Sequence, residues 1–330
     1  MTSGFGGEFD FISRIKATGR PRLPEVSMDI GDDAAVLDIP GQIVVTTDML
    51  TEGRHFRLDW MDARSAGWRA AIASLSDCAA MGARPVAAFL SIGLPAGRTA
   101  VLGDDLALGC LNALSAWNCT LAGGDTIQTD TEVVINLAIV AKACPRTLLR
   151  SGARPGDALL VTGHLGGARG ALLAFQAGEM NFQERLPNLW CRFARPVARV
   201  EAGEFLARQS CVHAMMDLSD GLAADLRRMA EASRVGVCIH LSSLPFEMEL
   251  EETVGITLEP PARTALLGGE DFELLLAADP ACSEILSKEF EQTLGIKLTH
   301  IGSITEDLSL IMVDEQGNKA PLPEGFQHFL

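Results

Sequence analysis

Apolar residues recur along this chain with two different spacings, which predict helices and strands. Trp68, Ile72, Leu75 and Ala79 share one stripe and predict a helix over 64–82. Further helices are expected at 101–117, 197–208 and 221–233, and strands at 42–47, 120–123, 132–140, 158–162, 212–216 and 272–277. A short amphipathic segment at 9–15 precedes a proline-containing loop. The pattern indicates a protein of mixed helices and strands.

A change of composition predicts where the chain divides. The stretch from Arg150 to Asp157 combines glycine, proline and charge between two apolar strands. Because 330 residues are enough for two domains, we predict domains at 1–150 and 151–330. After the boundary, a strand leads into a glycine-rich turn at Gly163, Gly166, Gly167 and Gly170. This turn lacks the GxGxxG spacing, so a dinucleotide site is disfavoured, but nucleotide contact stays open.

Charge and cysteine usage exclude several classes of function. The net charge of −16 argues against binding nucleic acid through a basic face, and against an anionic membrane surface. There is no run of 18 apolar residues, and the N-terminus shows no signal pattern. The eight cysteines form no CxxC pair, which is typical of buried free thiols in a reducing compartment. We therefore expect a cytoplasmic protein that handles anions through divalent cations.

Acidic residues beside small residues recur through the chain. The series begins at Gly31-Asp32-Asp33-Ala34-Ala35 and continues at 46–48, 76–77, 123–125, 217–221 and 268–271. We expect these acids at the ends of secondary-structure elements, where ligands gather in open sheets. Solvation is the alternative explanation for any one aspartate. Oxygen ligands without a histidine or cysteine cluster favour Mg²⁺ over zinc.

The common nucleotide-binding motifs are absent from the chain. There is no Gly-Lys dipeptide of a P-loop, and no His-Arg-Asp catalytic loop of a protein kinase. An ATP site would therefore have to hold its phosphates through metal ions and through backbone amides at glycine-rich turns. No serine, cysteine or histidine stands in an activated constellation, so no covalent nucleophile is predicted.

Seven motifs occur in a characteristic order: GDDAA, TTD, LSDxAAMGA, GGDT, RSGARPGD, DLSDGL and GGEDFEL. In this order they resemble the thiamine-monophosphate kinase family, which belongs to the superfamily of aminoimidazole ribonucleotide synthetase and selenophosphate synthetase. The resemblance runs from about residue 5 to the C-terminus. It implies an α+β (mixed α/β) fold. The N-terminal ATP-binding domain would have a mixed sheet flanked by helices, and a C-terminal α/β sandwich-like domain would close the site.

The resemblance also implies an activity and its site residues. The activity is phosphorylation of thiamine monophosphate to thiamine diphosphate by ATP, with several Mg²⁺ ions. The implied metal ligands are Asp33, Thr46, Thr47, Asp48, Asp77, Asp125, Asp217 and Asp220. The implied nucleotide contacts are Gly124, Asp125, Arg150 and Ser219, and the implied substrate contacts are His55, Glu270 and Phe326.

Some of these residues have simpler explanations, and one departs from the family. His55 alone is more often a loop histidine, Arg150 could be a linker charge, and Phe326 could be a core residue. The family has an aromatic residue at 326, often one with a polar edge, and phenylalanine would keep stacking but no hydroxyl contact. Ser74 stands where relatives often carry asparagine.

Two rival activities follow from the same superfamily. One is an ATP-dependent ligase that closes a purine-precursor ring, and the other is a maturation protein. The contexts of His55, RSGARPGD and GGEDFEL match the kinase better than the ligase. The chain lacks a cysteine before Cys78 and a cysteine at its C-terminal end, which disfavours the selenophosphate and maturation relatives. The resemblance also implies a homodimer formed through the first domains.

Overall fold

The computed structural model describes residues 8–18, 22–30, 33–98, 100–179 and 181–325. The chain forms two compact units. Unit 1 consists of Met1–Cys78 and Ala83–Ala143, and unit 2 of Ala79–Gly82 and Cys144–Leu330. Apart from the short segment Ala79–Gly82, the chain passes from unit 1 to unit 2 between Ala143 and Cys144, seven residues before the glycine- and proline-rich stretch that begins at Arg150.

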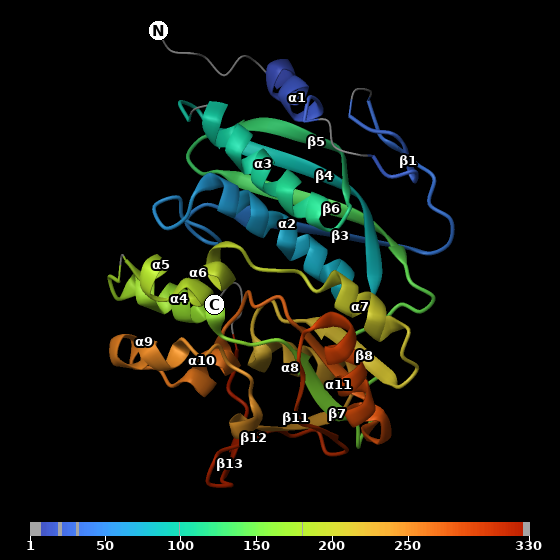
Figure 1. The fold of residues 1–330 in the computed structure, drawn as a ribbon, viewed down its shortest axis with the longest axis vertical. Helices are drawn as coiled ribbons and strands as arrows, with labels where there is room; N and C mark the ends of the chain where they lie inside the picture. The colour runs from blue at the N-terminus through green and yellow to red at the C-terminus, as the bar shows by residue number, and fades with distance from the viewer. Residues whose placement is uncertain (1–7, 19–21, 31–32, 99, 180, 326–330) are drawn as a thin grey trace. The chain divides into compact units, whose positions relative to one another are not determined.

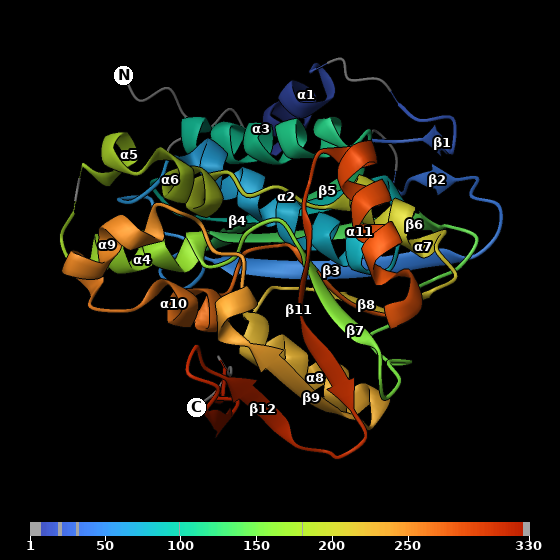
Figure 2. The ribbon, with the colours of Figure 1, turned by 60° about the horizontal axis from the view of Figure 1, so that its bottom comes forward.

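Unit 1 is a four-stranded mixed sheet with helices on one face (Figures 1 and 2). The strand order is β3 (Ile43–Thr51), β6 (Val134–Ala143), β4 (Ala83–Pro95) and β5 (Thr120–Thr129). β4 runs parallel to β5 and antiparallel to β6, and β3 is antiparallel to β6. The helices are α1 (Glu8–Lys16), α2 (Ala63–Ala80) and α3 (Ala100–Ala116), and β1 (Val26–Met28) pairs with β2 (Val36–Leu37).

The two faces of this sheet differ in burial because side chains alternate along each strand. Ile92, Ile135, Leu137 and Ile139 point to the helix-covered face and are almost fully buried. They form the core of unit 1 with residues such as Ile72 and Leu75 of α2. On the other face, β3 carries apolar side chains that are 50–62 % exposed: Ile43, Val45 and Met49. This second face therefore leaves a row of apolar side chains uncovered.

Unit 2 is built on a seven-stranded mixed sheet. The strand order is β13 (Lys319–Pro321), β12 (Leu310–Val313), β9 (Gly236–His240), β11 (Leu298–Thr305), β7 (Ala158–Thr162), β10 (Leu274–Ala278) and β8 (Val212–Asp217). All neighbouring strands are antiparallel except β12 and β9. The longer helices are α4 (Gly167–Gln176), α6 (Pro187–Ala194), α7 (Val200–Ala207), α8 (Leu222–Ser233), α9 (Leu250–Thr257) and α11 (Pro280–Leu294). The shorter elements are α5 (Phe182–Arg185), α10 (Pro261–Leu267) and a 3₁₀ turn, η1 (Leu241–Ser243).

The expected mixed α+β fold is confirmed, and most expected elements are present. The strands at 42–47 and 120–123 are longer than predicted, since β3 continues to Thr51 and β5 to Thr129. The strand predicted at 272–277 begins only at Leu274. No strand was expected at 83–95, where β4 lies in the interior of the first sheet. No helix in the described part of the chain is long and apolar enough to cross a membrane.

Candidate functional site

Two carboxylates meet inside unit 1, one from a strand and one from a helix. The sequence pattern predicted Asp48 at the end of a strand, but Asp48 lies within β3. Asp77 lies in the last turn of α2. The side chains of the two acids are in hydrogen-bonding contact, and the Thr46 hydroxyl donates to Asp77 Oδ2. Burial, followed by the charge of Asp77, raises the pKa of Asp48 to about 6. A cation bound here would relieve the repulsion between the two acids.

Two further polar side chains, Ser74 and Asn136, form hydrogen bonds with this part of β3. Neither was predicted to be a site residue. The buried Ser74 places its Oγ 3.0 Å from Asp48 Oδ2 and 2.8 Å from the Leu137 carbonyl oxygen. Asn136 donates from Nδ2 to Thr47 Oγ1 over 2.8 Å and to the Asp48 carbonyl oxygen over 3.0 Å. Apart from Lys142 near its end, Asn136 is the only polar residue of β6, a signal that could have singled it out.

The threonines and acids implied as metal ligands in unit 1 divide between the two faces of the sheet. Thr46 and Asp48 reach the helix-covered face, where they contact α2. Thr47 points the other way, because neighbouring strand residues alternate, and its side chain is exposed. Asp125 is exposed as well, and it lies within β5, opposite Ser91. The structure therefore brings Asp48 and Asp77 together but not Asp125 with them.

The remaining acid and the glycine of unit 1 lie apart from this pair. Asp33 is exposed in the connection between β1 and β2. Gly124 packs so tightly against β4 that a Cβ atom would lie 1.8 Å from the Leu90 carbonyl oxygen. Within the described ranges, no three His, Cys, Asp or Glu side chains are grouped closely enough to hold a metal ion. The oxygen donors of Asp48, Asp77 and Thr46 nonetheless fit the preference of Mg²⁺ for oxygen ligands.

His55 follows β3 in a tight turn, in which its N–H donates to the Thr51 carbonyl oxygen over 3.0 Å. Its Nδ1 accepts from the Thr51 backbone N–H over 3.1 Å, and its carbonyl oxygen accepts from Arg69 Nη2 over 3.3 Å. Since Nδ1 acts as an acceptor, the ring proton of the neutral imidazole sits on Nε2. The half-buried His55 can therefore present Nε2–H as a donor to a phosphate or another acceptor.

In unit 2, the DLSDGL and GGEDFEL motifs lie side by side. Asp217 ends β8 and is 7 % exposed. The Glu270 N–H donates to the Ser219 carbonyl oxygen over 2.8 Å, and the Phe272 N–H donates to that of Leu218 over 3.0 Å. Glu270 and Phe272 both have positive φ, 62° and 51°, a backbone conformation that side chains normally avoid. These hydrogen bonds bring the implied nucleotide contact Ser219 next to the implied substrate contact Glu270.

Asp220 already has a cationic partner within unit 2. Its carboxylate forms an ion pair with Arg228 Nη2, and Arg228 Nη1 lies 2.5 Å from Oδ1 of the buried Asp225. Asp225 Oδ2 accepts from the Asp220 and Gly221 backbone N–H groups. A metal ion at Asp220 would therefore share this carboxylate with Arg228. Arg150, the implied nucleotide contact, is exposed.

An ionic network is built around Glu273, the buried glutamate of the GGEDFEL motif. Glu273 is fully buried and accepts two hydrogen bonds from Arg199, at 2.6 Å from Nε and 2.5 Å from Nη2. Arg192 Nη1 and the Thr162 hydroxyl complete its partners at 3.2 Å and 2.7 Å. The Leu218 N–H donates to the Glu273 carbonyl oxygen over 2.8 Å. The network therefore fixes the C-terminal end of the motif against the strand that delivers Asp217.

The glycine-rich turn before α4 is filled by the protein's own groups. Both carboxylate oxygens of the buried Asp271 accept from the Gly166 N–H, at 2.9 and 3.0 Å. The N–H groups of Gly163 and Leu165 donate to backbone carbonyl oxygens. A Cβ at Gly163 would lie 2.2 Å from Glu273 Oε1. These glycines therefore allow close packing, and the amides of Gly163, Leu165 and Gly166 do not form an open phosphate cradle.

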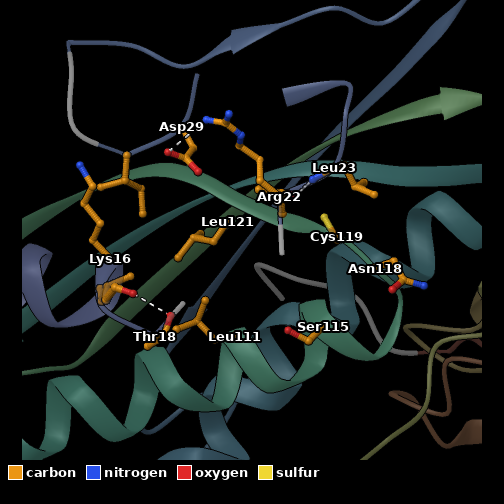
Figure 3. A pocket seen from close by; sticks show the side chains of 13 residues that line it. Lys16, Thr18, Arg22, Leu23, Asp29, Leu111, Ser115, Asn118, Cys119 and Leu121 are labelled. Atoms are coloured by element: carbon orange, nitrogen blue, oxygen red, sulfur yellow. Dashed lines mark hydrogen bonds and ion pairs between the residues drawn. The ribbon is translucent and has the colours of Figure 1, made fainter. Parts of the chain in front are cut away.

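A cavity of about 170 Å³ lies elsewhere in unit 1, among α1, α3, β1 and β5 (Figure 3). Its lining combines apolar side chains such as Leu111 and Leu121 with the charged Lys16, Arg22 and Asp29. No residue implied by the family resemblance lines it. The implied substrate contact Phe326 lies outside the described residues.

Both halves of the chain match family models of known proteins. Residues 31–143 match the family model of the AIR synthase related protein N-terminal domain, and residues 154–315 match that of the C-terminal domain. The chain is 32 % identical to a thiamine-monophosphate kinase of Rhodopirellula baltica, over 97 % of both chains. The chain therefore belongs to the thiamine-monophosphate kinase family of the AIR synthase related proteins.

Solved structures agree with this assignment. A crystal structure of thiamine-monophosphate kinase from Stenotrophomonas maltophilia K279a is 33 % identical, with a TM-score of 0.83 over 95 % of this chain and 98 % of that one. A structure described as AaThiL complexed with AMPPCP and TMP is 30 % identical, with a TM-score of 0.77 over 98 % and 97 %. The likeness covers both units.

Proposed function

We propose that this protein transfers the γ-phosphoryl group of ATP to thiamine monophosphate and so makes thiamine diphosphate, the last step of thiamine diphosphate biosynthesis. The observation that carries this proposal is the identity of 32 % over nearly the whole length to a thiamine-monophosphate kinase. The related structure with AMPPCP and TMP supports the same pair of substrates. The ring-closing ligase is not favoured, because the similar full-length relatives are named as kinases.

The residues of unit 1 would serve the nucleotide and its metal ions. We assign Mg²⁺ ligands to the pair Asp48 and Asp77 with the Thr46 hydroxyl, since these oxygens are already close together. Asp33, Thr47 and Asp125 are kept as further ligands on the family resemblance, and Gly124 as a nucleotide contact. When bound, Mg²⁺ would neutralise the charge of the phosphates and of these carboxylates.

The residues of unit 2 would serve both substrates. We assign metal ligation to Asp217 and Asp220, and nucleotide contacts to Arg150 and Ser219. Glu270 would contact the thiamine. Phe326 is kept as a second thiamine contact on the family resemblance. The paired loops support this assignment, because they hold Ser219 and Glu270 at fixed positions. In unit 1, His55 would donate from Nε2 to the phosphate of thiamine monophosphate. Arg150 suits a phosphate because its planar guanidinium can make two parallel hydrogen bonds.

The proposed chemistry is a direct in-line transfer. The acceptor is already an ionised phosphate at neutral pH, so no strong general base is required. The protein would supply alignment and charge neutralisation, which dominate phosphoryl transfer. ATP with a chiral γ-phosphate tests this step. Direct transfer inverts the configuration at phosphorus, and net retention would show a covalent intermediate.

We also propose that the protein is a homodimer and resides in the cytoplasm. The exposed apolar row on β3 supports pairing of two first units, because such a surface is usually covered by a partner. The eight free cysteines support a reducing compartment.

A product assay tests the proposed activity. Purified protein is incubated with ATP and Mg²⁺, and with either thiamine monophosphate or the purine-precursor substrate of the ring-closing ligase. We expect thiamine diphosphate and ADP in equal amounts from the first mixture and no cyclised product from the second. Cyclised product without thiamine diphosphate would overturn the proposal.

A further inference from the structure

Unit 2 holds a pair of neighbouring cysteines that the proposed reaction does not use. Cys211 lies directly before β8, and Cys282 lies in the first turn of α11. Both side chains are half-buried, and the two thiols lie close enough to interact electrostatically. Cys78 and Cys119 of unit 1 are also neighbours, but both are buried at 0 and 6 % exposure. Cys211 and Cys282 thus form a thiol pair that a small reagent can reach.

The backbone holds the two cysteines together. β8 and β10 pair antiparallel, with Val212 opposite Ala278. Beyond this pair, the Asp279 N–H donates to the Cys211 carbonyl oxygen over 2.9 Å. The Cys282 N–H then donates to the Asp279 carbonyl oxygen over 3.1 Å. Because both residues are tied to Asp279, the thiols stay adjacent without any rearrangement of a long loop.

We propose that Cys211 and Cys282 form a reversible intramolecular disulfide when the protein meets a low-molecular-weight disulfide such as oxidised glutathione. First, the Cys282 thiolate attacks one sulfur of glutathione disulfide, forms a mixed disulfide and releases one glutathione thiolate. The Cys211 thiolate then attacks the Cys282 sulfur and releases the second glutathione thiolate. Two protein thiols are oxidised, one glutathione disulfide is reduced, and the two protein protons pass to the released thiolates.

The order of attack follows from the surroundings of the two sulfurs. Burial, followed by the influence of the neighbouring Cys282 thiol, raises the pKa of Cys211 to about 11. Few Cys211 side chains are therefore thiolates at neutral pH, which makes Cys211 a poor first nucleophile towards a reagent in solution. Once Cys282 carries glutathione, its sulfur lies beside Cys211, and the high local concentration favours the second step.

The Cys211–Cys282 disulfide would lie at one end of the β8–β10 pair, and the implied metal ligand Asp217 lies at the other end. Val212 pairs with Ala278 at the cysteine end, and Asp217 pairs with Leu274 at the other. Oxidation should therefore leave catalysis unchanged and should raise the unfolding temperature, because the disulfide restricts the unfolded chain. This inference does not depend on the proposed function.

The test uses the full-length reduced protein with oxidised glutathione and intact-mass and peptide mass spectrometry. We expect the wild type to yield a linked peptide containing Cys211 and Cys282, two hydrogen atoms lighter than its two parts and separated by dithiothreitol, whether or not the exposed Cys191 carries glutathione. The Cys211→Ser variant should instead retain glutathione on Cys282. The Cys191→Ser variant, which removes an exposed cysteine, is the control and should behave like the wild type.

Thermal unfolding gives a second readout. The unfolding temperature should rise on oxidation of the wild type and of Cys191→Ser, and should not rise for Cys211→Ser. Two results would overturn the proposal: stable glutathione on Cys282 of the wild type with Cys211 still reduced, or no reaction at either cysteine when Cys191 is modified.

Discussion

Ser74 Oγ lies 3.0 Å from Asp48 Oδ2 and so links α2 to β3 beside the pair of carboxylates. The Ser74 side chain is completely buried, and its oxygen also lies 2.8 Å from the Leu137 carbonyl oxygen. The hydroxyl thus holds the carboxylate by one hydrogen bond, although burial and Asp77 both disfavour the charged form of Asp48.

The first prediction concerns Ser74. Replacing Ser74 by alanine removes the single hydroxyl donor that Asp48 and the Leu137 carbonyl oxygen share, and a partly buried acceptor left without its donor costs about 1–3 kcal/mol of stability. It should also weaken Mg²⁺ binding, because Asp48 loses the group that orients it. Ser74→Asn restores an amide donor and should recover part of the affinity. Mn²⁺ titration by calorimetry and the unfolding free energy measure the two effects. Equal metal affinity in all three proteins would contradict the positioning role.

The second prediction concerns the carboxylates themselves. Asp48→Asn and Asp77→Asn should lose nearly all kinase activity and should remain folded, because each substitution removes one of two repelling charges. Excess chelator should abolish wild-type activity, and added Mg²⁺ should restore it. Steady-state rates and circular dichroism are the measurements. Asp130→Asn, at an exposed aspartate of the same unit, is the matched control and should keep full activity. Activity that persists in excess chelator would rule out the metal assignment.

Helices such as α2 were predictable from their apolar stripe, and strands such as β8 from their β-branched and apolar runs. The position of Asp48 within β3 was not predictable. Aspartate is rare inside strands, so without knowledge of its tertiary contacts an aspartate after an apolar run is taken to mark the end of the strand. β4 was missed because its largely buried sequence shows no clean alternation and is interrupted by Pro85, Ser91 and Gly93. The positive φ of Glu270 is likewise invisible locally, since the hydrogen bond to Ser219 crosses a long stretch of chain.

The third prediction concerns the buried network around Glu273. Glu273→Gln would remove the fully buried carboxylate that Arg199 shares with Arg192, leaving Arg199 without this charged partner while Arg192 keeps Glu247, and breaking such a pair costs about 3–5 kcal/mol. Denaturant unfolding should therefore show a large loss of stability. The control is Glu204→Gln, which breaks a more exposed ion pair with Arg208 and should cost at most about 1 kcal/mol. Similar losses in the two variants would show that the network does not stabilise unit 2 in this way.

The fourth prediction concerns pH and Asp271. Burial raises the pKa of Asp271 well above its ordinary value, while the hydrogen bond from Gly166 opposes the shift. The folded protein therefore keeps this proton at a pH where the unfolded chain has lost it. The contribution to stability is full below the unfolded pKa and is lost as the pH rises through the folded pKa.

Asp271→Asn removes this titration and keeps an oxygen acceptor for Gly166. The variant should equal or exceed the wild type in unfolding free energy at neutral pH, and its stability should fall less between acidic and neutral pH. Urea unfolding across this range checks the slope. The exposed Glu315→Gln is the control and should leave the slope unchanged. If the unfolding free energy of Asp271→Asn fell more steeply with rising pH than that of the wild type, the prediction would be contradicted.

The fifth prediction concerns the open face of the unit 1 sheet. Val45 is 62 % exposed on β3 and lies between Ile43 and Met49 in the same apolar row. If this row is buried between two copies of the chain, each large aliphatic side chain contributes about 1.5–3 kcal/mol, and a charge placed there must lose its water. Light scattering after size exclusion should therefore show a wild-type dimer and a Val45→Asp monomer at micromolar concentration. Val101→Asp, on the helix α3 and equally exposed at 65 %, should remain a dimer. A wild-type protein that is monomeric and fully active would contradict the proposed dimer. Dissociation by Val101→Asp but not by Val45→Asp would show that the interface lies on the helix-covered side of the sheet.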